Sequence, residues 1–289
     1  MPSGDFDDGL PPLREVINSY GLRADKKFGQ NFILDLNLTR RIARTAGDMS
    51  ACDVIEVGPG PGGLTRGLLA EGARHVHVIE ADKRFVPALE DIAAAYPSRL
   101  SIHLGDALEI APQQLTDAPY RIVSNLPYNV ATPLLTGWLD AGWQNGVWQP
   151  PFLSMTLMFQ KEVAQRITAL PGDKHYGRLA VLAGWLSNAH LAFDVDRQVF
   201  VPPPKVTSAI IHLTPRAKPL ADADPDILAR LTAAAFGQRR KMLRASLKQI
   251  SLQPTEWLAA AGIDETARAE ALSIEQFCTL ANWLRDKSF

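Results

Sequence analysis

The sequence predicts an α/β fold, with a doubly wound and mostly parallel β-sheet followed by a small all-α domain. Short apolar runs typical of buried strands alternate with segments of helical periodicity between residues 53 and 215. The first of these runs ends in a glycine-rich turn, and every segment after residue 225 has a helical pattern. Repeated βα units imply parallel strands, because each helix returns the chain to the same edge of the sheet.

Length and composition fit this division. The chain has 289 residues, 46% of them hydrophobic and 21% charged, with a net charge of −1. We therefore expect an ordinary globular protein of one large and one small domain, and charge that is clustered rather than uniformly basic. The longest apolar run, Leu179–Leu186, is too short to cross a membrane, and the acidic N-terminus is no secretory signal. A cytoplasmic monomer is the default expectation.

Cysteine and histidine placement gives no sign of a metal centre. Cys52 and Cys278 are far apart and neither belongs to a Cys-x-x-Cys motif, so neither a disulfide framework nor a zinc site is expected. His75 and His77 would share one face of a strand, but no further residue completes a ligand set. The sequence therefore predicts no metal.

The N-terminal region predicts a short extension and a basic segment. Residues 1–22 form the extension, whose helix over residues 11–19 starts at a proline and stops before Gly21. A loop over residues 23–32 follows, with three basic residues and an exposed-type aromatic, and then a helix over residues 35–46. Arg40, Arg41 and Arg44 on that helix place a basic patch just before the glycine-rich turn.

The glycine-rich turn follows a short strand whose apolar residues are Val54, Ile55 and Val57. Gly58, Gly60 and Gly63 satisfy G-x-G-x-x-G, and Glu80 comes about twenty residues later, after a second strand. This pattern alone suggests a nicotinamide dinucleotide. However, Pro59 and Pro61 supply no N–H to a pyrophosphate, so a ligand without phosphates fits better. We expect S-adenosylmethionine, with Glu80 on its ribose and an acidic partner such as Asp106 for its adenine.

The remaining elements follow the same alternation. Expected strands lie at residues 75–79, 100–103, 120–124, 153–159, 192–195 and 208–213, and expected helices at residues 65–71, 83–96, 132–139, 161–168 and 177–185. A proline-bearing linker over residues 215–225 separates a first domain, residues 23–215, from an all-α domain, residues 216–289. Its helices are expected at residues 227–236, 239–250, 255–261, 266–271 and 273–287, the last opened by a Ser-x-x-Gln capping box.

A second motif, Asn125-Leu126-Pro127-Tyr128, ends the fourth expected strand on the same sheet edge as the glycine turn. The exocyclic amine of adenine is a poor nucleophile, because its lone pair is delocalised into the ring. An amide carbonyl on Asn125 and a main-chain carbonyl of Leu126 or Pro127 can accept both amino hydrogens and aim the nitrogen at a methyl carbon. Tyr128 can stack on the base, and Pro127 stiffens the turn. A strand-ending turn without chemistry is the alternative.

A basic cluster predicts contact with nucleic acid. Residues 238–248 contain five cations and no acid: Arg239, Arg240, Lys241, Arg244 and Lys248. On one continuous helix Arg240, Arg244 and Lys248 would share a face and could bind phosphates. A solvated basic helix surface is the simpler alternative. A base must leave its stack to enter a pocket of this kind, so the substrate would be single-stranded or flipped out.

With these residues in view, the chain resembles the ribosomal RNA adenine N6,N6-dimethyltransferases of the KsgA type. The resemblance runs from about Leu10 to the C-terminus and rests on the stretches at residues 27–32, 56–60, 78–82, 105–107, 125–128, 160–163, 200–206 and 238–241. It implies a Rossmann-like, class I S-adenosylmethionine-dependent methyltransferase domain. It also implies dimethylation of two adjacent adenosines in a hairpin loop near the 3′ end of small-subunit rRNA, on an assembling ribosomal particle.

The resemblance also implies residue roles. Asn31 and Ile33 would touch the methionine end of the cofactor, Gly58 its loop, Glu80 its ribose and Asp106 its adenine, while Asn125 would touch both methyl donor and acceptor. Phe200 would contact the target base. Two alternatives remain: a large-subunit rRNA methyltransferase of the Erm type, and a non-catalytic RNA-binding assembly factor on the same scaffold.

Overall fold

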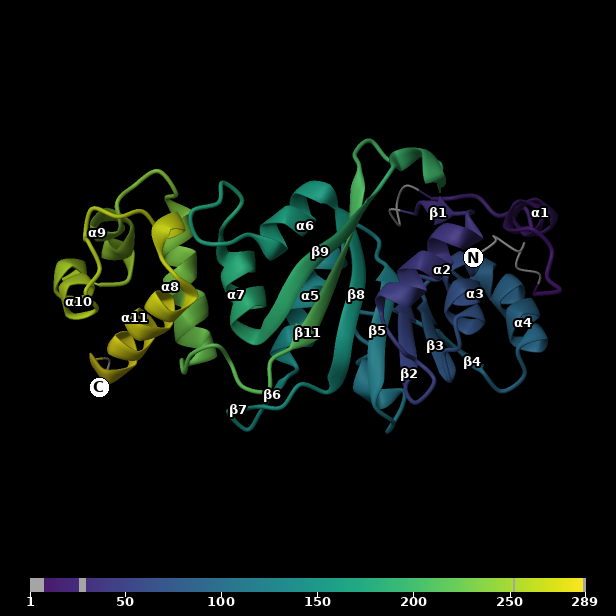
Figure 1. Cartoon of the computed structure of the whole chain (residues 1–289), viewed down its shortest axis with the longest axis horizontal. Helices are drawn as coiled ribbons and strands as arrows, with labels where there is room; N and C mark the ends of the chain where they lie inside the picture. The colour runs from purple at the N-terminus through teal and green to yellow at the C-terminus, as the bar shows by residue number, and fades with distance from the viewer. Residues whose placement is uncertain (1–7, 26–29, 252, 288–289) are drawn as a thin grey trace. The chain divides into compact units, whose positions relative to one another are not determined.

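The structure, a computed structural model, describes residues 8–25, 30–251 and 253–287 (Figure 1). Contacts divide the chain into two compact units, Met1–Lys161 with Leu191–Thr214 (unit 1) and Glu162–His190 with Pro215–Phe289 (unit 2). None of the helices in the described ranges combines the length and the apolar composition that a membrane-spanning segment needs.

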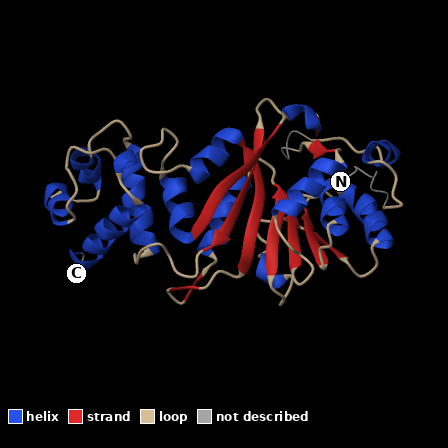
Figure 2. Ribbon diagram, viewed as in Figure 1, coloured by secondary structure: helices blue, strands red, loops and turns tan. Residues whose placement is uncertain are grey.

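The main sheet has seven strands in the order β4-β3-β2-β5-β8-β11-β9 (Figure 2). Adjacent strands from β4 to β8 are parallel, and β11 is antiparallel to β8, so the mostly parallel sheet expected from the sequence is confirmed. The strands are β2 (Asp53–Val57), β3 (His75–Glu80), β4 (Leu100–Leu104), β5 (Tyr120–Asn125), β8 (Phe152–Gln160), β9 (Ser187–Val195) and β11 (Ser208–Pro215).

Two short strand pairs were not expected from the sequence, because two-residue strands have no periodicity to detect. In unit 1, β1 (Phe32–Ile33) pairs antiparallel with β10 (Phe200–Val201). A hairpin joins β6 (Trp143–Gln144) to β7 (Val147–Trp148). The first pair matters for the site because it joins β1, the segment just after Asn31, to β10, which lies far along the chain.

The helices between the strands lie close to their expected positions. They are α1 (Leu13–Ser19), α2 (Leu36–Thr45), α3 (Gly63–Ala70), α4 (Val86–Ala95), α5 (Ala131–Asp140), α6 (Lys161–Thr168) and α7 (Arg178–Leu186), with 3-10 turns at Lys83–Phe85, Pro112–Gln114 and Arg197–Val199. Figure 1 shows α2, α3 and α4 together beside β2, β3 and β4. Fully buried side chains such as Ile42, Leu68 and Leu89 join these helices to Val54 and Val76 of the sheet in one hydrophobic core.

The N-terminal extension, described from Asp8 onward, packs within unit 1. Arg66 of α3 forms a buried ion pair with Asp8, 2.5 Å between nitrogen and oxygen, and also donates a hydrogen bond to the Pro11 carbonyl. Leu13 is buried, and the Tyr20 hydroxyl donates to Asp91 of α4. A buried arginine requires partners for its charge and its donors, and the extension supplies them.

After residue 215 the described part of unit 2 is helical, as expected. Its C-terminal elements are α8 (Pro225–Gly237), α9 (Leu243–Ser246), α10 (Pro254–Ala260) and α11 (Ile274–Lys287), with 3-10 turns at Leu247–Gln249 and Ala269–Ala271. The capping box before α11 is confirmed: Ser273 N–H donates to the Gln276 side chain, and Gln276 N–H donates to the Ser273 hydroxyl. The expected helix over residues 266–271 is only a single 3-10 turn.

The structure draws the domain boundary in a different place from the sequence. Residues 162–190 were expected in the first domain, but they group with the C-terminal helices. Two hydrogen bonds within unit 2 explain this: the Trp185 indole donates to the Ala221 carbonyl at 2.7 Å, and the Arg216 N–H donates to the Leu186 carbonyl at 2.9 Å. Sequence order placed α7 among the βα units, whereas its contacts place it beside α8.

Candidate active site

The candidate site lies in unit 1, where the strand order reverses direction between β2 and β5. Ligands of open α/β sheets bind at this point, because the loops leaving the two strands turn to opposite sides and leave a crevice. The β2–β5 register runs from the Asp53–Tyr120 pair to the Ile55–Ile122 pair. Beyond it, the Ser124 hydroxyl donates to the Val57 carbonyl at 2.6 Å and bridges the two strand ends.

The glycine turn takes a backbone shape that other residues rarely adopt. Gly58, Gly60 and Gly62 have φ values of +66°, +55° and +86°. A Cβ atom on Gly63 would lie 2.5 Å from the Ile33 carbonyl oxygen, so β1 runs directly against the start of α3. A Cβ atom on Gly58 would lie 3.4 Å from the Pro127 side chain. The glycine turn and the Asn125–Tyr128 motif are therefore neighbours, as the sequence predicted.

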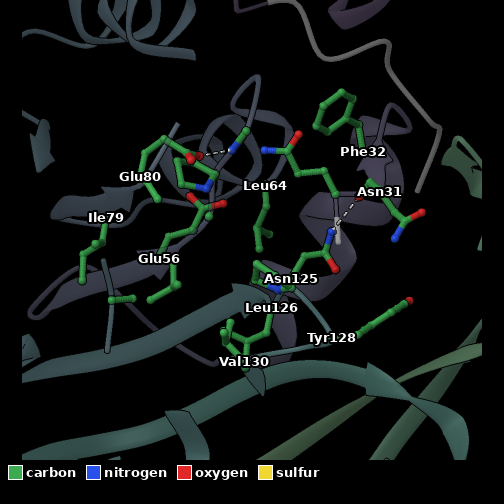
Figure 3. A pocket seen from close by; sticks show the side chains of 18 of the residues that line it. Asn31, Phe32, Glu56, Leu64, Ile79, Glu80, Asn125, Leu126, Tyr128 and Val130 are labelled. Atoms are coloured by element: carbon green, nitrogen blue, oxygen red, sulfur yellow. Dashed lines mark hydrogen bonds between the residues drawn. The ribbon is translucent and has the colours of Figure 1, made fainter. Parts of the chain in front are cut away.

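Glu80 ends β3 and points its carboxylate at the glycine turn (Figure 3). One oxygen accepts the Gly60 N–H at 3.0 Å, and the other accepts the Asp82 N–H at 2.8 Å. Each oxygen keeps a further lone pair for a ligand hydroxyl. Burial raises the pKa of Glu80, and the two backbone hydrogen bonds oppose that shift.

Glu56 is a lining residue that the sequence reasoning missed. It lies in β2 just before the turn, is 1% exposed, and faces the cavity (Figure 3). Burial raises its pKa to about 8, although the Thr65 hydroxyl donates to the carboxyl at 2.6 Å and partly opposes the shift. An acidic residue inside an otherwise apolar strand run was the available signal, since such a residue is rarely buried without a role.

Asn125 connects the acceptor motif to the segment before β1. Its side-chain NH₂ donates to the Asn31 carbonyl at 3.2 Å (Figure 3). An amide that donates through nitrogen in this direction leaves its oxygen free to accept from a ligand. Leu126 and Pro127 continue the wall of the cavity, and the Pro127 carbonyl already accepts the Val130 N–H at 3.1 Å. The Leu126 carbonyl is therefore the better second acceptor for an amine.

Together these residues enclose a cavity of about 240 Å³ with an acidic character. The described lining includes Asn31, Ile33, Gly58, Asp106 and Tyr128, and three of its members are carboxylic acids, whereas none is lysine, arginine or histidine. Asp106 is the exposed acid of the three, and its carboxylate accepts the Leu108 N–H at 2.9 Å. Among the described residues no cluster of acids, histidines and cysteines could hold a metal ion.

This lining fits S-adenosylmethionine better than a dinucleotide. The three carboxylic acids of the lining give a pyrophosphate no positive charge to bind, but each can ionise beside a cation, and Pro59 and Pro61 present no N–H to phosphate oxygens. S-adenosylmethionine carries a positive sulfonium and an ammonium group. The charge of the cavity therefore agrees with the interpretation of the turn that the sequence favoured.

Phe200 is not where the sequence placed it. A contact with a target base was expected, but the Phe200 side chain is 1% exposed, belongs to the hydrophobic core and lies outside the lining of the cavity. The cause is the β1–β10 pair, in which Phe200 stands opposite Ile33 and faces inward. Its neighbour Val201 carries the exposed side chain of this strand.

The basic cluster in unit 2 is not one continuous helix. α8 ends at Gly237, the Lys241 N–H closes a turn on the Gln238 carbonyl, and Met242 is extended before the short helix α9 begins. The helix is interrupted there because the Leu243 N–H donates to the Ala267 carbonyl. This is a tertiary contact, which no local sequence pattern shows. The expected shared face of Arg240, Arg244 and Lys248 is therefore wrong.

Two of the five cations have acidic partners. Arg239 pairs with Glu270 and also donates to the Lys174 carbonyl, and Arg244 pairs with Glu265 at 2.7 Å. Arg240, Lys241 and Lys248 are exposed, and within the described part of the chain they have no ion pair. Residues 27–32 are one of the stretches on which the family resemblance rests, and the first three of them, Lys27 to Gly29, lie outside the described residues.

The family described as ribosomal RNA adenine dimethylase matches residues 21–286. A Paracoccus denitrificans (strain Pd 1222) protein named ribosomal RNA small subunit methyltransferase A is 60% identical over 277 residues, which cover 96% of this chain and 97% of that protein.

Two solved structures are similar as well. The 23S rRNA methyltransferase ErmE is 28% identical with a TM-score of 0.67, covering 88% of this chain and 100% of that one. A dimethyladenosine transferase from Plasmodium falciparum is 24% identical with a TM-score of 0.73, covering 88% and 98%, and supports the fold.

Proposed function

Because the chain belongs to the ribosomal RNA adenine dimethylase family, we propose that it transfers methyl groups from S-adenosylmethionine to N6 of two adjacent adenosines in small-subunit rRNA. The adenosines would lie in the hairpin loop near the 3′ end, and the substrate would be the assembling particle. We expect the protein to act in the cytoplasm as a monomer. The observation that carries the proposal is the acidic cavity in which the glycine turn meets Asn125.

The cofactor residues fit one binding direction along the cavity. Asn31 and Ile33, on the segment that runs against the start of α3, would hold the methionine end beside Gly58. Glu80 would accept from the ribose hydroxyls with the lone pairs that Gly60 and Asp82 leave unused. Asp106, at the exposed end of the cavity, would accept from the adenine amino group.

The acceptor residues would prepare the adenine nitrogen for attack. When bound, S-adenosylmethionine would supply an electrophilic methyl carbon on a positively charged sulfur. The Asn125 side-chain oxygen and the Leu126 carbonyl would accept the two amino hydrogens and hold the nitrogen lone pair toward the donor. Alignment of this kind can contribute about 7–11 kcal/mol to lowering a barrier. Tyr128 would stack on the base, and Pro127 holds the turn in shape.

The substrate class can be tested directly. We expect the protein, incubated with S-adenosyl-[methyl-³H]methionine, to label RNA of purified small subunits and to leave large-subunit rRNA unlabelled. The likeness to ErmE makes the large-subunit reaction the second candidate. Label on large-subunit rRNA alone would replace the proposed substrate with that one. Binding to the particle without any methyl transfer would support a non-catalytic assembly factor.

The RNA surface of unit 2 would use its unpaired cations. Arg240 and Lys241 lie in the exposed turn between α8 and α9 and have no acidic partner among the described residues. Such cations can neutralise phosphates without first breaking an ion pair, and each phosphate contact contributes to the salt dependence of binding. Lys248, at the 3-10 turn after α9, would add a further phosphate contact and so a further contribution to the salt dependence of binding.

We expect Arg240→Glu with Lys241→Glu to weaken binding to small-subunit particles and to reduce the slope of log K against log salt by about 2, one for each lost phosphate contact. Filter binding over a salt series measures this. A matched control is Arg14→Glu with Lys83→Glu, which makes the same charge change at exposed positions of unit 1. Equal slopes for the two double variants would show that only net charge matters.

A further inference from the structure

A buried serine outside the cavity holds one of the acceptor residues. The Ser208 hydroxyl lies 2.5 Å from the Tyr128 hydroxyl, within hydrogen-bond distance, although the two residues are 80 positions apart in the chain. Ser208 is 0% exposed and opens β11, and it does not line the cavity. Its hydroxyl meets the lining of the cavity at Tyr128, and the acceptor chemistry described above gives that hydroxyl no role.

Sheet register brings the two hydroxyls together. Asn125 stands beside Met158 across the β5–β8 pair, and Ser208 stands beside Gln160 across the β8–β11 pair. The β8 partner of Ser208 therefore lies two residues beyond the β8 partner of Asn125. This places Ser208 level with the turn that follows β5 and carries Tyr128. The start of β11 is fixed by a 2.9 Å hydrogen bond from the Lys161 N–H to the Thr207 carbonyl. The serine hydroxyl is consequently a rigid anchor.

The anchor decides how the tyrosine ring can lie. Figure 3 shows Tyr128 beside Asn125, with its hydroxyl at the end of the ring far from Asn125. A ring held at Cβ alone can tilt about its two side-chain torsions, whereas a ring also held at the hydroxyl cannot. A tyrosine hydroxyl is protonated at neutral pH, and burial raises the pKa of Tyr128 further, so this hydroxyl can donate or accept in the bond.

We propose that Ser208 is a positioning residue, which fixes the tilt of the Tyr128 ring on which the target adenine stacks. This inference rests on the proposed function and assigns the base-stacking role to the Tyr128–Ser208 pair rather than to Phe200. The ring would form one wall for the base, set at a constant angle by β11, while Asn125 and Leu126 hold the amino group. Losing the anchor would misplace the base without touching the cofactor side of the cavity.

A double-mutant cycle with Ser208→Ala and Tyr128→Phe tests the proposal. Each variant removes the same hydrogen bond from one end. We expect each to lower kcat for methylation of small subunits by about 3- to 10-fold, the range of a typical net hydrogen bond, and we expect the double variant to be no slower than the slower single variant. The dissociation constant for S-adenosylmethionine should stay within about twofold in all three.

The control is Ser154→Ala, which removes another buried serine hydroxyl from the same sheet. Ser154 is 1% exposed, lies near the start of β8, at the end of the strand opposite to Gln160, and accepts a hydrogen bond from Arg121 of β5. We expect this variant to keep the kcat of the unsubstituted protein, even where it lowers thermal stability. Ser208→Thr, which restores a hydroxyl, should recover part of the lost turnover.

Three results would overturn the proposal. Effects that multiply in the double variant would show that Ser208 does not act through Tyr128. Unchanged kcat in Ser208→Ala would show that the anchor is dispensable, and weaker cofactor binding would show a general disturbance of the site. Methylation by the unsubstituted protein is measured first. If it fails, the proposed function is wrong and the role of Ser208 loses its premise; if it succeeds, the variants test the role of Ser208 alone.

Discussion

Asn125→Ala is expected to lower kcat for adenine methylation by about 10²- to 10³-fold, the usual cost of removing one preorganised polar group from a reacting centre. The side-chain oxygen of Asn125 is the group we assign to the target amine, since its nitrogen is engaged with the Asn31 carbonyl at 3.2 Å. Single-turnover methylation of small subunits measures the chemical step. Equilibrium dialysis with labelled S-adenosylmethionine should show a dissociation constant within about tenfold of the unsubstituted value, the worth of the one hydrogen bond lost to Asn31.

The matched control is Asn129→Ala, in the same loop. Asn129 also lines the cavity, but from an exposed position, and we assign it no contact with the amine. It should keep turnover within about threefold, as exposed positions without a special contact usually do. If Asn125→Ala kept most of its turnover, or if both variants lost it equally, the assignment of Asn125 to the amine would be wrong.

Glu56→Gln is expected to make the ligand-free protein more stable at pH 8, by an amount on the order of a few kcal/mol. Burial gives the carboxyl a pKa of about 8, against 4.5 for an unperturbed glutamate. Between these values the unfolded chain has lost the proton that the folded chain keeps, so stability falls as pH rises through this window. Glutamine has no proton to lose, so the variant should show a flatter profile.

Urea unfolding at pH 5, 6.5 and 8 measures the effect. The gap between variant and unsubstituted protein should grow with pH. Glu109→Gln, a change of the same kind at an exposed residue, should leave the pH profile as it is. Parallel profiles for Glu56→Gln and the unsubstituted protein would mean that Glu56 titrates normally.

The Glu56 carboxyl should also couple the binding of S-adenosylmethionine to the release of a proton. A cation beside Glu56 favours the ionised form, so binding of S-adenosylmethionine between pH 6 and 8 should release protons. Calorimetry in two buffers with different ionisation enthalpies detects this release. Glu56→Gln should reduce it, with Glu80, whose pKa is also raised by burial, accounting for any remainder.

Much of the site could be predicted from the sequence because its parts are local. Glu80 and Asn125 end their strands, Gly58 and Asp106 come within two residues of a strand end, and parallel strands bring those ends to one edge of a sheet. The turn can be predicted because glycine is the residue that most readily adopts positive φ. The phosphate argument against a dinucleotide needed only the two prolines, and it agrees with the acidic lining of the cavity.

The errors have one cause in common, which is a contact between distant segments. Phe200 faces the core because β10 pairs with β1, and two-residue strands carry no pattern. The helix expected over residues 239–250 is broken because Leu243 bonds to the Ala267 carbonyl. Helical propensity is a weak preference that such tertiary contacts override.

The sequence by itself therefore determined the fold class, the glycine turn and the Asn125–Tyr128 motif, since each depends on periodicity or on residues adjacent in the chain. Only the tertiary structure decided which side chains share the cavity with them. The burial that raises the pKa of Glu56, the pairing that hides Phe200 and the anchor that Ser208 gives Tyr128 all depend on segments far apart in the chain. Their proximity comes from how the strands are ordered in the sheet, and local residue patterns do not encode that order.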